Sequence, residues 1–255
     1  MSKHQKKDRR TNHIIIKIIR IAINIVIKPE RLKHIKDLKN RIKHGNFVKR
    51  EFINFVSDKI LDPKIILEIG SRDAIQSIEF SRIYPKAKIY AFECNPESIE
   101  FCIKNTKNYK NIEVVPFAVF NKDGRMAFYV VPELIGASSL FKLTKDYSNK
   151  NKFSQIQITV RATRIDTWAK EKGINKIDLI WIDLQGAEYE AFEGMGKLLS
   201  DVQAIYTEVE VKELFENQKL VNDVSKLLDK NGFFLLRYTK SNNSFGNAIY
   251  INKLQ

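Results

Sequence analysis

The chain has 255 residues, 44% of them hydrophobic and 29% charged, which is enough for one full-sized α/β domain with a proper core and a short appendage. Its net charge of +14 is unevenly placed, because residues 1–50 hold 16 Lys and Arg against 3 acids while residues 51–255 hold 28 against 27. The basic character therefore belongs to an N-terminal arm and says little about the body.

Cysteine and histidine usage excludes several kinds of site. The two cysteines, Cys94 and Cys102, suggest neither a metal site nor a disulfide framework, which indicates a reducing compartment. All four histidines, at positions 4, 13, 34 and 44, lie in the arm. Any proton chemistry in the body must therefore use carboxylates, Lys, Tyr or water.

The arm, residues 1–45, is predicted to contain one amphipathic helix. In residues 14–28 the polar side chains step by three or four positions and form a narrow stripe, while nearly all others are apolar. This stretch is too short and too charged for a membrane span, which needs about 20 apolar residues, and no signal-peptide cleavage site follows it. With the basic residues up to position 50, it is typical of a helix on an anionic membrane surface, so we expect a cytoplasmic protein held at the inner face of the membrane. Packing on its own domain or on a partner subunit is the alternative, and the apolar content argues against nucleic acid.

The body, residues 46–255, opens with a helix and a βαβ unit. Residues 65–69 form a short, nearly unbroken apolar run, as in a parallel strand that is covered on both faces. Gly70 ends this run, and Glu93 falls at the carboxyl end of the next strand, where open α/β sheets bind their ligands. The expected elements up to this point are a helix at 47–61, a strand at 65–69, a helix at 74–83 and a strand at 87–92.

The loop after the first strand decides the expected cofactor. Gly70 lets the backbone pass close to a ligand, and Glu93, 23 residues later, can accept hydrogen bonds from both hydroxyls of a ribose. A dinucleotide needs the pattern G-x-G-x-x-G, but this loop has one glycine and an acid, Asp73, near the helix start. A carboxylate there would repel a pyrophosphate and suits the ammonium or sulfonium of S-adenosylmethionine. The methyl donor is therefore favoured over NAD, and a unit without any nucleotide is the remaining alternative.

The rest of the chain alternates between strands and helices and closes with a hairpin. Strands are expected at 112–119, 125–131, 156–162, 177–183, 202–209, 233–238 and 247–252, and helices from Pro96, from 165 to about 173, at 187–199 and at 220–230. This order predicts a mostly parallel sheet with one reversed strand. Residues 132–155 show no steady period and are interpreted as a loop over the cofactor that helps to admit the acceptor, with surface disorder as the alternative.

Several blocks, in this order, resemble the FkbM family of S-adenosylmethionine-dependent methyltransferases. They are LEIGSRDA at 67–74, YAFECNP at 90–96, GASSL at 136–140 and above all IDLIWIDLQGAEYEAFEGM at 177–195, supported by RIDT at 164–167, EVE at 208–210 and GNAIYIN at 246–252. The resemblance covers residues 64–253 and implies a Rossmann-like class I methyltransferase fold, with a mostly parallel seven-stranded sheet and a C-terminal antiparallel hairpin strand. It also implies methyl transfer, usually to a hydroxyl, with sugars, glycolipids and polyketides among the acceptors of the family.

The resemblance gives roles to residues at one edge of the sheet. For the donor, we expect backbone contacts from Gly70 and Ser71, contacts to the amino-acid end from Glu68 and Asp73, a ribose contact from Glu93, and adenine contacts from Ala118 and Val119. Asp183, at the carboxyl end of a central strand, is the first choice for the base that takes the proton of the acceptor hydroxyl, with Glu188 and Glu208 as reserves. The alternatives are that Asp183 caps the next helix or binds the ammonium group of the donor, and that Glu188 is a structural helix acid.

The chain departs from the family pattern at two places. Arg72 and Ala74 stand where further glycines are frequent, and Gln185 stands where the frequent D-V-E-G-A-E has an acid. A divalent ion that bridges Asp183 and Glu208 is an open alternative to a protein base. Together with the basic arm, the resemblance predicts O-methylation of a sugar in a surface polysaccharide or glycolipid, by an enzyme that works alone or as a homodimer. A donor-binding scaffold without catalysis and an NAD-linked sugar oxidoreductase are the other hypotheses.

Overall fold

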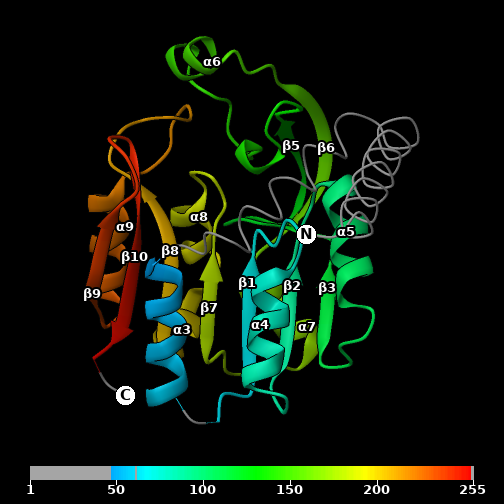
Figure 1. The fold of residues 1–255 in the computed structure, drawn as a ribbon, viewed down its shortest axis with the longest axis vertical. Helices are drawn as coiled ribbons and strands as arrows, with labels where there is room; N and C mark the ends of the chain where they lie inside the picture. The colour runs from blue at the N-terminus through cyan, green and yellow to red at the C-terminus, as the bar shows by residue number, and fades with distance from the viewer. Residues whose placement is uncertain (1–46, 61, 254–255) are drawn as a thin grey trace, which may run out of the picture. The chain divides into compact units, whose positions relative to one another are not determined.

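The computed structural model describes residues 47–60 and 62–253 (Figure 1). The chain divides into two compact units, Met1–Phe47 and Val48–Gln255, and the described residues belong almost entirely to the second. The predicted arm, residues 1–45, lies outside the described part, so its helix and its membrane contact stay predictions. None of the helices within the described ranges is long and apolar enough to cross a membrane.

A seven-stranded sheet forms the centre of the second unit. Its strands are β1 (Ile65–Ile69), β2 (Lys88–Phe92), β3 (Ile112–Val115), β7 (Leu179–Ile182), β8 (Ala204–Glu210), β9 (Phe233–Lys240) and β10 (Phe245–Asn252). They lie in the order β3-β2-β1-β7-β8-β10-β9, in which the pairs from β3 to β8 are parallel and β10 runs antiparallel to both of its neighbours. The predicted mostly parallel seven-stranded sheet with a reversed C-terminal strand is confirmed.

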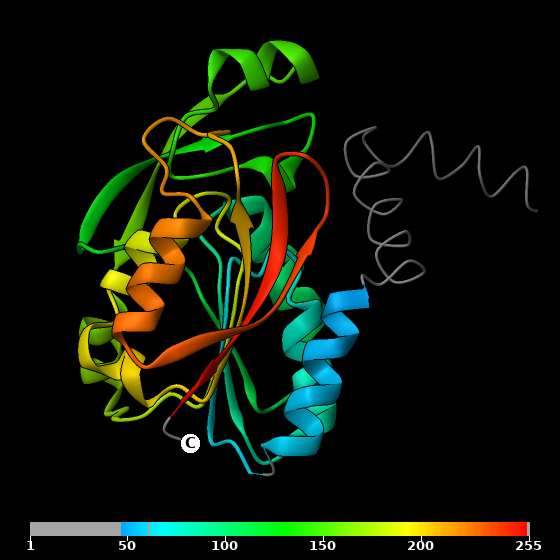
Figure 2. The same cartoon turned by 90° about the vertical axis from the view of Figure 1, so that its left-hand side faces the viewer.

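Helices cover both faces of this sheet (Figure 2). On one face lie α3 (Phe47–Lys59), α4 (Ile75–Ile83) and α5 (Pro96–Thr106), and on the other α7 (Ile165–Lys172), α8 (Glu188–Glu193) and α9 (Val221–Lys230). Ile66 belongs to the apolar cluster that contains Phe52 of α3 and Phe80 of α4, whereas the next residue, Leu67, belongs to the cluster that contains Trp168 of α7. Because side chains alternate between two buried faces, the central strands are nearly continuous apolar runs, which is why the sequence predicted them.

A second, three-stranded sheet stands at the carboxyl ends of the parallel strands (Figure 1). It consists of β4 (Ala118–Val119), β5 (Gly124–Val130) and β6 (Ile156–Thr163) in the order β4-β6-β5. The strand expected over residues 112–119 is therefore wrong as one element, because its two halves belong to different sheets. Pro116 lies at the break, and a proline has no backbone N–H to continue a ladder.

Two further predicted segments differ in detail. The helix expected over 187–199 ends at Glu193 and is followed by a 3₁₀ helix, η2 (Gly196–Asp201). Gly194 lies between them, and a Cβ on it would be 2.2 Å from the backbone oxygen of Phe120, so the chain passes here in close backbone contact. Residues 132–155, predicted to be irregular, contain η1 (Ile135–Ala137) and α6 (Lys145–Asn151).

Candidate active site

The loop after β1, residues 70–74, makes a sharp turn at Gly70 and is called the donor loop below. Gly70 has a φ of +82°, and a Cβ atom on it would lie 2.0 Å from the backbone oxygen of Asp183, so a larger residue does not fit. The N–H groups of Gly70 and Ser71 donate to the carbonyl of Phe92 at 3.0 and 2.9 Å. The loop thus joins the ends of β1, β2 and β7. Because both N–H groups are occupied, the predicted donor contacts of Gly70 and Ser71 would have to use their carbonyl or Cα groups.

Glu68 of β1 and Asp73 of the loop after it are buried, and their carboxylates lie at the N-terminus of α4. The Glu68 carboxylate accepts hydrogen bonds from the backbone N–H of Ser77 at 2.8 Å and from its hydroxyl. Asp73 accepts from the backbone N–H of Ile75 at 3.4 Å and lies 3.7 Å from the Arg72 guanidinium. Negative charge is favourable at this end of a helix, so both acids hold α4 against the donor loop. Their contact with the amino-acid end of a donor stays a prediction.

Glu93 ends β2 with its carboxylate turned toward the surrounding backbone. Its Oε1 accepts from the N–H groups of Cys94 and Asn95, both at 2.8 Å, and its Oε2 accepts from the N–H of Arg72 at 2.8 Å. Burial raises the pKa of Glu93 to about 7, against the hydrogen bonds from Asn95 and Cys94, which lower it. A carboxylate has about four acceptor positions, and three are used here. The position that is left suits one ribose hydroxyl, rather than the two that the sequence suggested.

Residues around Glu93 fit an adenosine group. Asn95 is 4% exposed, and its Nδ2 has no hydrogen-bond partner within the described residues, which is rare for a buried donor and leaves it available for a ligand acceptor. Ala118 packs in the cluster that includes Cys94, next to the end of β2, whereas Val119 belongs to the core under the main sheet. The buried acid, the amide and Ala118 therefore suit a nucleoside, while the structure places Val119 in the core.

One amide joins the two acids that the sequence placed at the ends of the central strands. The Nε2 of Gln185 donates to Asp183 Oδ1 at 2.7 Å and to Glu208 Oε1 at 2.9 Å. Gln185 has a φ of +55°, a conformation that costs of order 1 kcal/mol or more outside glycine and that clusters at functional sites. The two N–H groups offset the repulsion between the carboxylates. The amide nitrogen therefore lies where a bridging divalent ion was considered, and the described ranges contain no group of three or more His, Cys, Asp or Glu side chains arranged to hold a metal.

Two more acids, Glu188 and Glu210, are buried close to this pair. Glu188 accepts from the backbone N–H groups of Leu184 at 2.6 Å and Gly186 at 2.9 Å, so it shapes the turn that carries Gln185. Burial raises the pKa values of both acids above the usual range, and the nearby negative charges add to this. These hydrogen bonds support the alternative that Glu188 has a structural role in the turn, while its role as a reserve base stays a prediction.

The segment 132–155 lies against the donor loop and against the turn after β7 that carries Gln185. A Cβ on Gly136 of η1 would be 2.7 Å from Arg72 Nη1, so η1 touches the donor loop. The hydroxyl of Ser139 donates to the backbone oxygen of Gln185 at 2.8 Å, which ties the segment to the turn after β7. The segment predicted to be irregular thus contacts the donor loop and the turn after β7, while its predicted role over the cofactor stays a prediction.

Helix α6 extends this segment over the residues that follow β8. The N–H of Thr144 donates to the carbonyl of Leu214 at 2.9 Å, and the N–H of Glu216 donates to the carbonyl of Lys142 at 2.8 Å. Tyr147 of α6 has a raised pKa because it is buried and because Glu208 and Glu210 are negative neighbours. The Tyr147 phenol therefore lies within electrostatic range of the carboxylates of Glu208 and Glu210.

Residues 68–235, more than half of the chain, match the family model described as the methyltransferase FkbM domain. The chain belongs to the FkbM methyltransferase family. The resemblance seen in the sequence is confirmed, together with the class I fold, methyl transfer as the activity and S-adenosylmethionine as the donor.

Curated relatives of this FkbM methyltransferase cover most of its length. It is 31% identical over 175 residues to the 2-O-methyltransferase NoeI of Sinorhizobium fredii, across 66% of this chain and 71% of the relative. It is 21% identical over 207 residues to the hexuronic acid methyltransferase AglP of Haloferax volcanii, across 78% of this chain and 77% of the relative. Among solved structures, magnesium protoporphyrin IX methyltransferase from Synechocystis with bound SAM has a TM-score of 0.49 and 13% identity, over 83% of this chain and 81% of the other.

Four residues of this FkbM site were missed or undervalued in the sequence. Gln185 was noted as a departure, but its contact with two acids depends on β7 and β8 being neighbours. Asn95 was not predicted as a site residue, because an asparagine before a proline is already explained as the N-cap of α5. Ser139 and Tyr147 belong to a segment without a period, and nothing in the sequence connects them to β7 and β8.

Proposed function

We propose that this protein transfers a methyl group from S-adenosylmethionine to a hydroxyl of a sugar in a surface polysaccharide, glycolipid or related glycan. The names of two relatives support this acceptor, because one is a 2-O-methyltransferase, which indicates a hydroxyl, and the other a hexuronic acid methyltransferase, which indicates a sugar. The observation that carries the proposal is the bridged pair of Asp183 and Glu208 beside the donor loop. An alcohol is a poor nucleophile until its proton begins to leave, so an acceptor hydroxyl needs such a carboxylate.

Asp183 is the base in this proposal. Its Oδ1 accepts the amide of Gln185, and its Oδ2 is the oxygen that takes the proton from the acceptor hydroxyl. Gln185 holds the carboxylate in one orientation and donates to Glu208 as well, so an N–H group of the same amide faces each of the two acids. The backbone contact between Gly70 and Asp183 fixes the base relative to the donor loop, which is the positioning that an in-line displacement requires.

The donor is held by the residues of the β1 and β2 ends. S-adenosylmethionine supplies the methyl group as an electrophilic carbon on a positively charged sulfur. Glu93 would accept from one ribose hydroxyl, Asn95 Nδ2 would donate to an acceptor atom of the nucleoside, and Ala118 would contact the adenine. The buried acids at the start of α4 favour a positively charged ligand over a pyrophosphate.

The acceptor would enter under α6. The ring of Tyr147 lies 6.0 Å from that of Phe153 in an edge-to-face pair, which gives an aromatic surface beside Glu208 and Glu210. Sugar rings have apolar faces that pack on aromatic side chains, and their hydroxyls donate to carboxylates. An aromatic surface for the apolar face of the ring and carboxylates for its hydroxyls are the two features that suit a sugar acceptor.

Calorimetry and a transfer assay test the proposal. We expect the protein to bind S-adenosylmethionine and its demethylated product but not NAD, and to move a radiolabelled methyl group onto a glycan extract. Binding of the donor without transfer to any glycan would favour a scaffold, and binding of NAD instead would favour an oxidoreductase. Since an amide already bridges the acid pair, activity should survive exhaustive chelation.

The arm is proposed to hold the enzyme at an anionic membrane surface, where it would meet lipid-linked or nascent glycans. Support comes from the 16 Lys and Arg in residues 1–50 and the apolar stretch at 14–28. Deleting residues 1–45 should move the protein from the membrane fraction to the supernatant. An unchanged membrane share would remove this part of the proposal, and the choice between monomer and homodimer stays open to sedimentation.

A further inference from the structure

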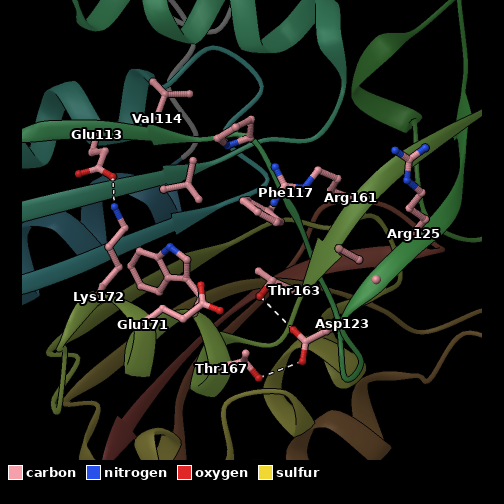
Figure 3. Close-up of a pocket in the computed structure, with 15 residues that line it drawn as sticks. Glu113, Val114, Phe117, Asp123, Arg125, Arg161, Thr163, Thr167, Glu171 and Lys172 are labelled. Atoms are coloured by element: carbon pink, nitrogen blue, oxygen red, sulfur yellow. Dashed lines mark hydrogen bonds and ion pairs between the residues drawn. The ribbon is translucent and has the colours of Figure 1, made fainter.

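A cavity of about 570 Å³ lies between β3, the start of β5, the end of β6 and α7 (Figure 3). Its volume is in the range of about 300 to 1,000 Å³ that is typical of ligand pockets. None of the residues assigned above to the donor or to the acceptor lines it. The cavity is therefore a separate feature of the fold, built where the second sheet meets the edge of the main one.

Two acids of the lining already have donors. Glu113 forms an ion pair with Lys172 at 2.7 Å, and Asp123 accepts from the hydroxyls of Thr163 at 3.1 Å and Thr167 at 3.0 Å (Figure 3). These contacts stay inside the wall of the cavity. They leave neither Glu113 nor Asp123 as a natural partner for further positive charge.

Two arginines of the lining, in contrast, have no acidic partner within the described residues. Arg125 of β5 and Arg161 of β6 are directly opposite each other in the antiparallel pair, and like charges in this position destabilise a sheet. Within the described residues neither forms an ion pair, and Glu171, the remaining acid of the lining, pairs with neither. The guanidinium of Arg161 lies 4.2 Å from the centre of the Phe117 ring, a cation–π contact with another residue of the lining.

We propose that Arg125 and Arg161 form an anion-binding subsite that takes the carboxylate or phosphate of an acidic glycan. Arginine is the side chain that binds planar and tetrahedral oxyanions through two parallel N–H donors, and an oxyanion between the pair would remove their repulsion. The glycan as ligand rests on the proposed function, while the anion itself rests on the arginine pair and the cavity alone. No residue assigned above to methyl transfer lines the cavity, so the role proposed for the subsite is to hold an acidic glycan and not to react with it.

The charge distribution favours a glycan over a nucleic acid. Residues 51–255 hold 28 Lys and Arg against 27 acids, so the body has almost no net positive charge with which to attract a phosphate backbone. The lining of the cavity includes two arginines, both exposed to solvent, on neighbouring strands. That arrangement suits one or two oxyanions on a short segment of a chain.

The test compares two double variants of the full chain that lose the same charge. Arg125→Ala with Arg161→Ala empties the subsite, and Lys104→Ala with Lys107→Ala removes two exposed positive charges from the region of α5. Each protein is titrated with a hexamer of galacturonic acid and with the neutral hexamer maltohexaose at one fixed salt concentration. The basic arm is present in all of them, so its contribution cancels.

We expect the Kd for the acidic hexamer to rise at least tenfold in the arginine variant and less than twofold in the lysine variant, with no measurable binding of maltohexaose. Arg161→Lys keeps the charge but loses the two-donor geometry, so its Kd should lie between those of wild type and the double variant. The unfolding temperature of the arginine variant should equal or exceed that of wild type, because a repulsion is removed, so a loss of folding would be seen directly.

Equal losses in the two double variants, or undiminished binding in the arginine variant, would overturn the subsite. Displacement of the hexamer by the demethylated donor product would also overturn it, because the cavity would then belong to the donor site. Stronger binding of a single-stranded hexanucleotide than of the hexuronate would assign the pair to nucleic acid and also overturn it. Donor affinity and methyl transfer to neutral glycans are measured in parallel. A failure of the proposed methyl transfer would appear there, while the binding titration tests the arginines by themselves.

Discussion

The acids at the donor end of the site differ from those at the acceptor end in what they contact. Glu68 and Glu93, at the ends of β1 and β2, accept hydrogen bonds from backbone N–H groups, which are fixed in place by the strands and by α4 and α5. Asp183 and Glu208, at the ends of β7 and β8, share the amide of a side chain, Gln185. A carboxylate held by backbone is suited to binding a ligand in one place. Asp183, held through Oδ1 by one side-chain amide, keeps Oδ2 for the acceptor hydroxyl in the proposed reaction.

Gly70 and Asp183 join these two halves through a backbone contact that no side chain could tolerate. The comparison therefore predicts that substitutions on the acceptor side change the rate of methyl transfer and that those on the donor side change donor affinity. Substitutions at the contact between Gly70 and Asp183, called the joint below, should change the stability of the fold.

The largest effect is expected for Asp183→Asn. Its remaining oxygen can still accept the amide of Gln185, but it cannot take a proton, so kcat should fall by about 10² to 10⁴. The Kd for S-adenosylmethionine should stay within twofold of wild type. The matched control is Asp146→Asn, an exposed acid of α6, which should leave kcat unchanged. A kcat for Asp183→Asn within tenfold of wild type, with donor binding intact, would mean that the base is another group.

The joint is tested by Gly70→Ala. A Cβ would lie 2.0 Å from the Asp183 backbone oxygen, at a φ of +82°, so strain and overpacking should lower the free energy of unfolding by about 2 to 5 kcal/mol. Gly173→Ala is the control, because it has a φ of +69° but no atom within 4 Å of the added Cβ. Chemical denaturation of both variants measures the difference. Equal losses in the two would show that the close contact at Gly70 contributes nothing beyond its backbone angle.

Glu93→Gln tests the donor side. Losing a charged hydrogen bond to the ribose costs about 1.5 to 3 kcal/mol, so the Kd for the donor at pH 8 should rise at least tenfold. Because burial raises the pKa of Glu93 to about 7, the wild-type acid becomes protonated as the pH falls, and the gap between the two proteins should shrink by pH 6. Glu97→Gln, an exposed acid in the first turn of α5, is the control. A gap that stays constant from pH 8 to pH 6 would contradict the raised pKa.

Gln185→Glu should lower the rate of methyl transfer. The amide that donates to Asp183 and Glu208 becomes a third carboxylate, so two hydrogen bonds are lost, like charges repel, and kcat should fall by about tenfold. Three carboxylates are also a donor set for Mg²⁺, so added Mg²⁺ should partly restore kcat in this variant and have little effect on wild type. The measurement is kcat with and without Mg²⁺. An unchanged kcat would mean that residue 185 does not influence the base.

The smallest effect is expected for Tyr147→Ala. The loss of one aromatic contact to a sugar is worth about 0.5 to 1.5 kcal/mol, so the KM for the glycan should rise roughly threefold to tenfold while kcat changes little. Tyr147→Phe keeps the ring and should resemble wild type, unless the hydroxyl near Glu208 and Glu210 also binds the acceptor. A KM unaffected by the alanine substitution would move the acceptor away from α6.

The sequence determined those parts of the protein that depend on neighbours along the chain. The apolar runs that became β1 and β7 reflect burial on both faces, and Gly70 marks a turn that needs a positive φ. Glu93 and Asp183 were found because a strand end brings its last residues to the edge of the sheet, whatever the rest of the fold does.

Tertiary structure decided the contacts that join distant segments. The strand predicted across Pro116 was divided between two sheets because the partner of β4 is β6, a strand more than 30 residues away. The sequence showed at position 185 only that an acid frequent in the family is replaced by Gln185. Its amide bridges Asp183 and Glu208 because β7 and β8 are neighbouring strands. The opposed Arg125 and Arg161 follow from the register of an antiparallel pair. Register and strand order are set by the burial of the whole core, and a local pattern contains no information about the atom that a side chain will meet from another part of the chain.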